Sequence, residues 1–316
     1  MPRVSDERLL IPLVPGSQHS CEDEDLTFII LWSSVAADTM KVHITADMEG
    51  VAVVSHDDQV ESKNAEFARI RELMTSEVEA AVEGARDAGA TEILVCDAHD
   101  TGRNLIVEKM DRDIEVIEGS PYDLGMMAGI SRDFDASFQV GYHSMRHTHA
   151  GVLGHTYTYE IAELRLNGIV VGESGLSAAI AGHFGVPVVF VSGDAHAVRQ
   201  ARSLVKNIVG VPTKEGVGLY SVRTLTPDKA CELIRRGARE ALEKLEEIEP
   251  FTLKKPIQME VEFERPLMAE YVSHVPQVKR KDIKTVSFRA SDMVEAFHVF
   301  EVMQRLAAYA KSQGPL

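Results

Sequence analysis

Cysteine is scarce in this chain, with 3 among 316 residues, at positions 21, 96 and 231. The wide spacing offers no framework for disulfide bridges and no thiolate cluster for a closed structural zinc site. This usage is typical of a reducing compartment, so we expect a cytoplasmic protein. Cys96 lies in an apolar run, where a small buried hydrophobic side chain is the simplest interpretation.

Positive charge is also in short supply. Lys and Arg number 33 against 49 Asp and Glu, which gives a formal net charge of -16 and a pI near 5.2. Such a surface repels phosphate backbones and anionic lipids, so we expect neither nucleic acid nor a membrane as a partner. The chain also lacks a glycine-rich phosphate-binding motif after its first strand, which argues against a nucleotide-binding protein.

Residues 1–39 have few features of a globular domain. The apolar run 26–37 ends in two alanines, as a signal peptide does, but residues 22–25 carry negative charge where a signal peptide needs positive charge. The run is also too short to span a bilayer. We therefore expect residues 1–39 to be a disordered extension or the result of a misassigned start codon.

Strands and helices alternate from Met40 onward, which is typical of a mostly parallel sheet with helices on both faces. The order changes after Pro250 to strand 257–263, helix 266–274, strand 285–289 and helix 291–309. We therefore predict an α/β metal-binding catalytic domain at 40–210. A smaller C-terminal α+β domain at 211–316 is expected to pack on it and to contribute a contact between subunits.

Several local features support this assignment. Apolar residues recur at helical spacing across 67–85, and Asn167-Gly168 suits a two-residue type I′ turn in a hairpin. A short glycine-rich helix is predicted around 125–130, and a helix over 174–184 precedes a buried strand at 186–191. A long amphipathic helix is expected to begin at Thr226-Pro227.

Three apolar runs lead directly into side chains that bind metals. The run 42–46 precedes Asp47 and Glu49, the run 93–96 precedes Asp97 and His99, and the run 138–141 precedes His143. Because the carboxyl ends of parallel strands open onto one crevice, these residues are predicted to share a site. Carboxylate and imidazole ligands suit zinc and similar divalent ions, and Asp47 and Glu49 share one face if the strand continues, so one of them can bridge two ions.

Two further positions are candidates. Glu173 stands at the start of a predicted helix, where its carboxylate either interacts with the helix N-terminus or binds metal. Four histidines lie between positions 143 and 155. His147 and His149 occupy a polar loop and are expected to face solvent, whereas His155 is a candidate acid, base or nucleophile.

The motifs taken together resemble the dinuclear zinc D-aminopeptidases, also described as the dipeptide-operon peptidase family. The resemblance runs from about Met40 to about Ala310. It rests on Ala46-Asp47-Met48-Glu49-Gly50, Asp97-Ala98-His99, Gly141-Tyr142-His143, Gly154-His155-Thr156, Asn167-Gly168, Gly172-Glu173 and Ser192-Gly193-Asp194. The chain departs from the family at Ala195-His196, where a second acidic residue often follows Asp194.

The resemblance implies two Zn²⁺ ions per subunit and a homo-oligomer, in the family a decamer whose active sites face an internal channel. Its metal ligands would be Asp47 as the bridge, Glu49 and His99 in one site, and His143 and Glu173 in the other. It also implies that His155 is the catalytic imidazole.

The function that the resemblance implies is a zinc-dependent aminopeptidase that removes N-terminal, D-configured amino acids from short peptides or amino-acid amides by two-metal activation of water. One alternative is a dinuclear amidohydrolase or phosphoesterase acting on a small metabolite, although the acidic surface argues against a phosphate. The other alternative is a non-catalytic α/β assembly protein that binds metal.

Overall fold

A seven-stranded sheet with the strand order β3-β2-β1-β4-β7-β8-β9 forms the centre of the fold. Its strands are β1 (Lys41–Ala46), β2 (Glu92–Asp97), β3 (Glu115–Ile117), β4 (Ala136–Tyr142), β7 (Val188–Asp194), β8 (Val209–Gly218) and β9 (Ser221–Thr224). All neighbours pair in parallel except β8 and β9. The predicted mostly parallel α/β sheet is confirmed.

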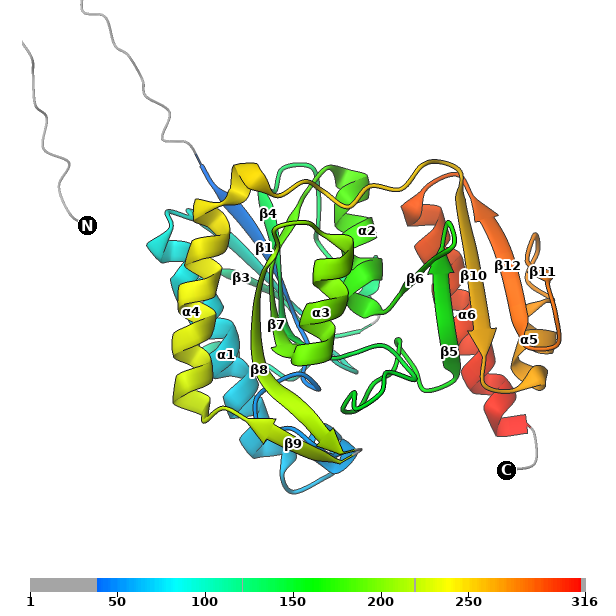
Figure 1. Cartoon of the computed structure of the whole chain (residues 1–316), viewed down its shortest axis with the longest axis horizontal. Coiled ribbons are helices and arrows are strands. Elements are labelled where there is room, and N and C mark those ends of the chain that lie inside the picture. The colour runs from blue at the N-terminus through cyan, green and yellow to red at the C-terminus, as the bar shows by residue number, and fades with distance from the viewer. Residues whose placement is uncertain (1–38, 121, 219, 314–316) are drawn as a thin grey trace, which may run out of the picture. The chain divides into compact units, whose positions relative to one another are not determined.

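The computed structural model describes residues 39–120, 122–218 and 220–313 (Figure 1). The predictions for the leader, including the apolar run 26–37 and Cys21, fall outside the described residues. Within the described part of the chain, no helix has the length and apolar character needed to cross a bilayer.

Helices cover both faces of this sheet, as predicted. On one face, α1 (Phe67–Asp87) packs against α4 (Pro227–Glu243), while α2 (Glu173–Phe184) and α3 (Ala195–Leu204) lie on the other (Figure 1). A side chain at Gly84 would overlap the carbonyl of Arg235, so this glycine permits the close approach of α1 and α4. The helical spacing of apolar residues in α1 places Ile70, Met74 and Val78 on one face, and this face is completely buried.

A second, antiparallel sheet has the order β11-β12-β10-β5-β6. It consists of β5 (Ile161–Leu166), β6 (Ile169–Val171), β10 (Ile257–Phe263), β11 (Lys279–Arg280) and β12 (Thr285–Ala290), and it packs against α5 (Pro266–Val272) and α6 (Met293–Gln313). The β5–β6 hairpin turns at Asn167 and Gly168, whose φ angles of 50° and 83° confirm the type I′ turn.

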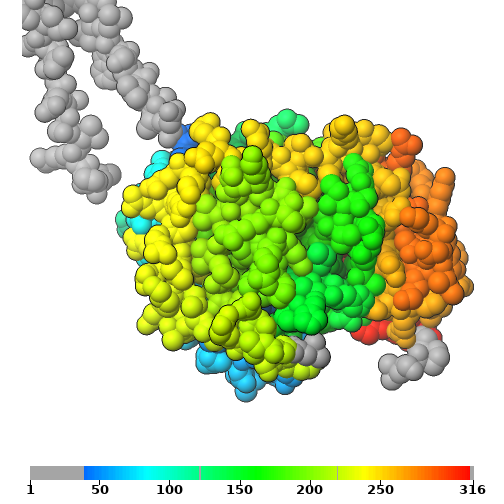
Figure 2. All heavy atoms as spheres, in the orientation of Figure 1, coloured from blue at the N-terminus to red at the C-terminus, as the bar shows by residue number. Residues whose placement is uncertain are grey.

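The division into two domains at residue 210 stays a prediction. Each of the two sheets contains strands from before and after this residue. Strand β8 crosses residue 210, while β5 and β6 precede it and belong to the second sheet. Helix α6 of the second layer also contacts α2 of the first. The space-filling view shows residues of the 145–171 segment, in green, between the α3–β8 region and the C-terminal elements in orange (Figure 2).

Some expected local structure differs. The predicted helix at 125–130 is only a 3₁₀ turn at Gly125–Met127, because Gly125 and Gly129 adopt φ angles of 53° and 82° that an α-helix excludes. The sequence analysis also missed α3, β8 and β9. Three more 3₁₀ turns lie at Asp57–Gln59, Val107–Lys109 and Leu245–Glu247.

The order of the strands places a crevice between β1 and β4. From β1 the chain proceeds outward through β2 and β3, whereas from β4 it proceeds through β7 and β8 in the other direction. In an open parallel sheet, ligands bind at this reversal, outside the carboxyl ends of the strands. Ala46 pairs in register with both Asp97 and Val140, so β1 and β2 end together at this edge and β4 ends two residues further, at Tyr142.

Candidate metal centre

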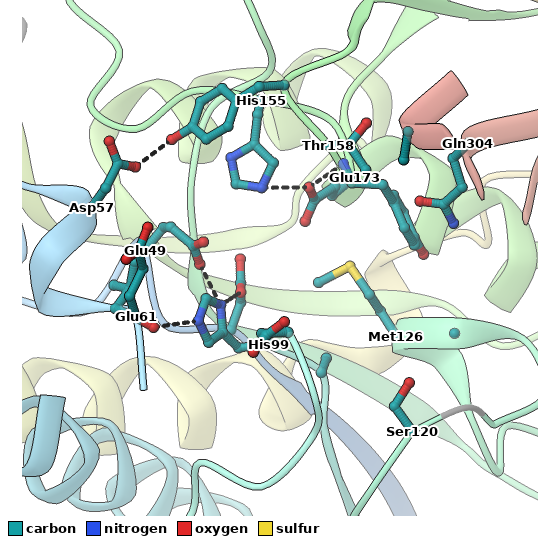
Figure 3. Close-up of a pocket in the computed structure, with 18 of the residues that line it drawn as sticks. Glu49, Asp57, Glu61, His99, Ser120, Met126, His155, Thr158, Glu173 and Gln304 are labelled. Atoms are coloured by element: carbon teal, nitrogen blue, oxygen red, sulfur yellow. Dashed lines mark hydrogen bonds and ion pairs between the residues drawn. The ribbon is translucent and has the colours of Figure 1, made fainter. Parts of the chain in front are cut away.

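The residues after these strand ends converge at the crevice. Asp47 and Glu49 follow β1, His99 follows β2, His143 follows β4, and Glu173 is the first residue of α2. Their exposed fractions are 3%, 6%, 7%, 3% and 5%. In Figure 3, Glu49 and His99 lie on one side of the cavity, and His155 and Glu173 lie across from them. The structure therefore brings together the residues that the sequence singled out.

Asp47 lies between the two histidines. Its Oδ1 is 3.5 Å from Nδ1 of His99, and its Oδ2 is 3.4 Å from Nε2 of His143. On the outer sides, Oε2 of Glu49 is 2.9 Å from His99 Nδ1, and Oε2 of Glu173 is 3.4 Å from His143 Nε2. Each histidine thus faces Asp47 and one further carboxylate, which creates two adjacent subsites that share Asp47.

Backbone carbonyl groups fix the tautomers of the two histidines. Nε2 of His99 lies 3.0 Å from the carbonyl of Val60, and Nδ1 of His143 lies 2.9 Å from the carbonyl of Ser144. A carbonyl only accepts, so these nitrogens carry the protons in the neutral rings. The opposite nitrogens, His99 Nδ1 and His143 Nε2, therefore direct lone pairs toward the carboxylates.

Several of these buried atoms have no hydrogen-bond partner among the described residues: Oδ2 of Asp47, Oε2 of Glu49 and Nε2 of His143. Buried polar atoms are normally paired, because leaving one unpaired costs about 1–3 kcal/mol. One donor atom each from Asp47, Glu49 and His143, and one each from His143, His155 and Glu173, lie within 4.8 Å of one another. Carboxylate oxygens and imidazole lone pairs that face one another in this way fit a divalent cation.

The clustered carboxylates shift the proton equilibria of the site. Burial and the neighbouring Glu49 raise the pKa of Asp47 to about 7. Burial alone would lower the pKa of His143, but Glu173 and Asp47 outweigh it and raise that pKa to about 10. The site therefore attracts positive charge strongly, and a metal cation binding there would displace protons.

His155 stands beside this cluster in a stack of rings. Its ring lies 4.1 Å from that of His143 at an angle of 18° and 4.9 Å from that of Tyr159. Nδ1 of His155 is 2.8 Å from the carbonyl of Leu153 and carries the proton in the neutral ring, whereas Nε2 is 3.6 Å from Glu173 Oε1. Burial and the nearby His143 lower the pKa of His155, which favours the neutral form.

The sequence analysis did not identify Tyr159 or the charged residues that contact it. The Tyr159 hydroxyl donates to Asp57 over 2.6 Å, and the Arg146 guanidinium lies 5.1 Å from the centre of the Tyr159 ring. Arg146 in turn pairs with Glu264 at 2.9 Å. These contacts hold Tyr159 against His155. In the sequence, the one sign of them is the presence of aromatic and charged residues close to His155.

The other sequence candidates have structural roles or face solvent. Asp97 accepts hydrogen bonds from the backbone of Asn104 and Leu105 and so shapes the loop that carries His99. Cys96 is fully buried, as predicted. His147 and His149 are exposed, also as predicted, and His147 pairs with Glu264.

A cavity of about 720 Å³ opens beside the cluster and includes Asp47, Glu49, His99, His155 and Glu173 in its wall. Helix α6 supplies part of the opposite wall, where Gln304 is visible in Figure 3 near Met126. Besides the residues of the cluster, the charged lining consists of Asp57, Glu61, Asp100 and Glu301 against Lys63 and Arg305. The cavity is thus large enough for a short peptide and is acidic.

An open parallel sheet with carboxylates and imidazoles converging at its topological switch point defines a class, the α/β proteins with a site for divalent metal ions. Comparison with known proteins narrows this class. The D-aminopeptidase family model, peptidase M55, matches residues 40–302. The chain therefore belongs to the D-aminopeptidase family and is a peptidase, as the sequence motifs predicted.

A sequence and a solved structure, both of a Bacillus subtilis D-aminopeptidase, are similar to this chain over almost their entire length. A D-aminopeptidase of Bacillus subtilis (strain 168) is 32% identical over 269 residues, which cover 85% of this chain and 98% of the relative. The solved structure of the Zn-dependent D-aminopeptidase DppA from Bacillus subtilis, described as a self-compartmentalizing protease, superposes with a TM-score of 0.83 at 32% identity and the same coverage.

Proposed function

We propose that this chain is a zinc-dependent aminopeptidase that removes N-terminal D-amino acids from short peptides or amino-acid amides. The proposed ligands are Asp47 as a bridge between two zinc ions, Glu49 and His99 for one ion, and His143 and Glu173 for the other. The observation that carries this assignment is the position of Asp47, whose two carboxylate oxygens face different histidines.

When bound, zinc lowers the pKa of water toward neutrality and polarises a carbonyl group. His155 is proposed to move the proton that amide hydrolysis requires. Its Nδ1 is held by the carbonyl of Leu153, so Nε2 is the atom free to take a proton from the nucleophile or to give one to the leaving amine. His143 stacks on the ring of His155, and Tyr159 contacts the same ring at an angle of 37°, so both restrict its rotation.

The charge of the cavity supports a peptide rather than a phosphate substrate. Beyond the proposed ligands, its lining holds four carboxylates and two cationic side chains. This excess of negative charge attracts the N-terminal ammonium group of a peptide and repels a phosphate monoester. It therefore argues against the phosphoesterase alternative.

The proposal extends to assembly and location. The self-compartmentalizing relative supports a homo-oligomer, and we propose the decamer that the family resemblance implies. The cysteine usage supports a cytoplasmic location.

A panel of matched D- and L-aminoacyl amides, dipeptides and tripeptides tests this function. We expect kcat/KM to be at least about tenfold higher for the D-series, a difference of roughly 1.4 kcal/mol in transition-state binding. Chelation of the metal should lower turnover of the best substrate by at least about 10³-fold, and added zinc should restore it. Equal or faster hydrolysis of the L-series would refute the stereochemical assignment, and undiminished turnover by metal-free protein would refute zinc dependence.

A further inference from the structure

One buried ammonium group lies beneath the loop that carries Glu49. Lys214, on β8, is only 3% exposed. Its Nζ donates to the backbone carbonyls of Glu49, Val51 and Val54, the latter two over 3.1 and 2.6 Å. All three protons of the ammonium group are therefore used on one short stretch of backbone.

Neighbouring side chains hold three further peptide groups of the 49–54 loop. The hydroxyl of Thr213, next to Lys214 on β8, lies 3.1 Å from the carbonyl of Gly50 and 3.2 Å from that of Gly193, and it donates its single proton between them. The backbone N–H of Ala52 donates to Glu77 over 2.8 Å, and that of Val53 donates to Thr224 over 2.9 Å. Side chains from β8, β9 and α1 thus fix the loop from below.

The backbone of this loop is strained. Val53 has a φ of 69°, a conformation that is rare and sterically costly for a β-branched residue. Such a conformation persists only where surrounding contacts over-determine it. The carbonyls that Lys214 binds at Val51 and Val54 flank Val53 on both sides. Lys214 is therefore placed to hold the loop in a shape that it would not adopt alone.

An apolar core residue would be easier to bury at this position. Removing an ammonium group from water is costly unless hydrogen bonds and opposite charges compensate it. Here the three carbonyls compensate it. The fully buried Asp194, the register neighbour of Lys214 on β7, adds a favourable charge nearby without a hydrogen bond to the ammonium group. We therefore interpret this buried, fully hydrogen-bonded lysine as a group that fixes the backbone around Glu49.

The Glu49–His99 subsite depends on this loop directly. Glu49 lies within it, and the Val60 carbonyl that orients His99 lies shortly after it. The other subsite meets the loop through the backbone, where the N–H of Gly50 donates over 2.7 Å to the carbonyl of Gly141, two residues before His143. The side chains of His143 and Glu173 are held elsewhere, by the carbonyl of Ser144 and the backbone N–H of Tyr157. Lys214 has no hydrogen bond to either of these residues.

We propose that Lys214 is a positioning residue for the Glu49–His99 metal subsite and sets the zinc affinity of that subsite by fixing the 49–54 loop. The inference rests on the proposed two-zinc function. It goes beyond that function in one respect. It states that Lys214 raises the affinity for one zinc ion more than for the other, although Lys214 has no hydrogen bond to the side chain of Glu49 or His99.

The test compares the zinc affinities of wild type, Lys214→Met and Lys214→Arg by titration against competing chelators. We expect two ions per chain in wild type. In Lys214→Met one ion should bind about 10- to 100-fold more weakly, as for other groups that orient metal ligands, while the other should change by less than about threefold. Lys214→Arg retains donors and charge and should recover much of the lost affinity. Crystals of Lys214→Met at limiting zinc should show an ion at His143 and Glu173 only.

Two further variants complete the test. Lys206→Met removes an exposed lysine from the connection between α3 and β8 and should behave as wild type. Thr213→Val deletes the hydroxyl bonded to the Gly50 carbonyl and should weaken the same ion by a smaller factor, which keeps the test decisive if Lys214→Met does not fold. Unchanged affinities, or equal weakening of both ions, in a two-zinc protein would overturn this inference alone. A wild-type chain that binds no zinc would overturn the proposed function as well.

Discussion

Replacing Asp47 with alanine should abolish zinc binding and turnover together. Its two carboxylate oxygens face His99 and His143, at 3.5 and 3.4 Å, so its loss disrupts both subsites at once. Metal ions contribute several kcal/mol of transition-state stabilisation, which corresponds to a fall in kcat/KM of at least about 10³-fold. Zinc content by elemental analysis and turnover of a D-aminoacyl substrate measure the two effects.

Asp133→Ala is the matched control, because Asp133 is an exposed aspartate before the first residue of β4, at the end of that strand opposite the crevice, and should leave both quantities unchanged. Asp47→Asn keeps the size of the side chain and removes its charge, and it should also lose metal. An Asp47→Ala protein that retains two ions with wild-type affinity would show that Asp47 does not bridge them.

The second large effect is expected at His155. Alanine at this position should lower kcat by about 10² to 10⁴-fold, the usual contribution of general acid–base catalysis. Both zinc ions should remain bound, because the proposed ligand set does not include His155. KM should change little if the imidazole acts mainly in the chemical step. Steady-state kinetics and zinc analysis on one preparation separate these effects.

His149→Ala provides the control for His155→Ala, since His149 lies in the same region of the chain and is exposed. It should retain wild-type kcat and zinc. One donor atom each from His143, His155 and Glu173 also lie within 4.8 Å of one another, which makes ligation the competing role for His155. Loss of one zinc ion in His155→Ala would therefore assign His155 as a ligand and remove it from proton transfer.

The convergence of the site was largely predictable from sequence. Each of β1, β2 and β4 is a buried run that leads into a potential ligand, and the rule for parallel sheets places such strand ends at one edge. What the sequence could not decide was the role of Glu173. A carboxylate at the first turn of a helix is common, and only the fold places it 3.4 Å from His143.

The supporting residues were not predictable, because they depend on long-range packing. Lys214 lies on a strand that the sequence analysis missed, since Gly210, Pro212 and Gly216 weaken the strand pattern of β8. Its partners at residues 49–54 are more than 150 positions earlier in the chain. Gln304 lines the cavity from α6, a helix near the end of the chain that packs on α2 as well as on the second sheet.

The position of the metal ions is the most direct test of the account. Crystals of the purified protein soaked in zinc should give two anomalous peaks at the zinc absorption edge, about 3.5–4 Å apart as in other two-metal sites. One peak should lie between Glu49 and His99, the other between His143 and Glu173, with Asp47 touching both. A single peak, or peaks away from Asp47, would contradict the two-metal assignment.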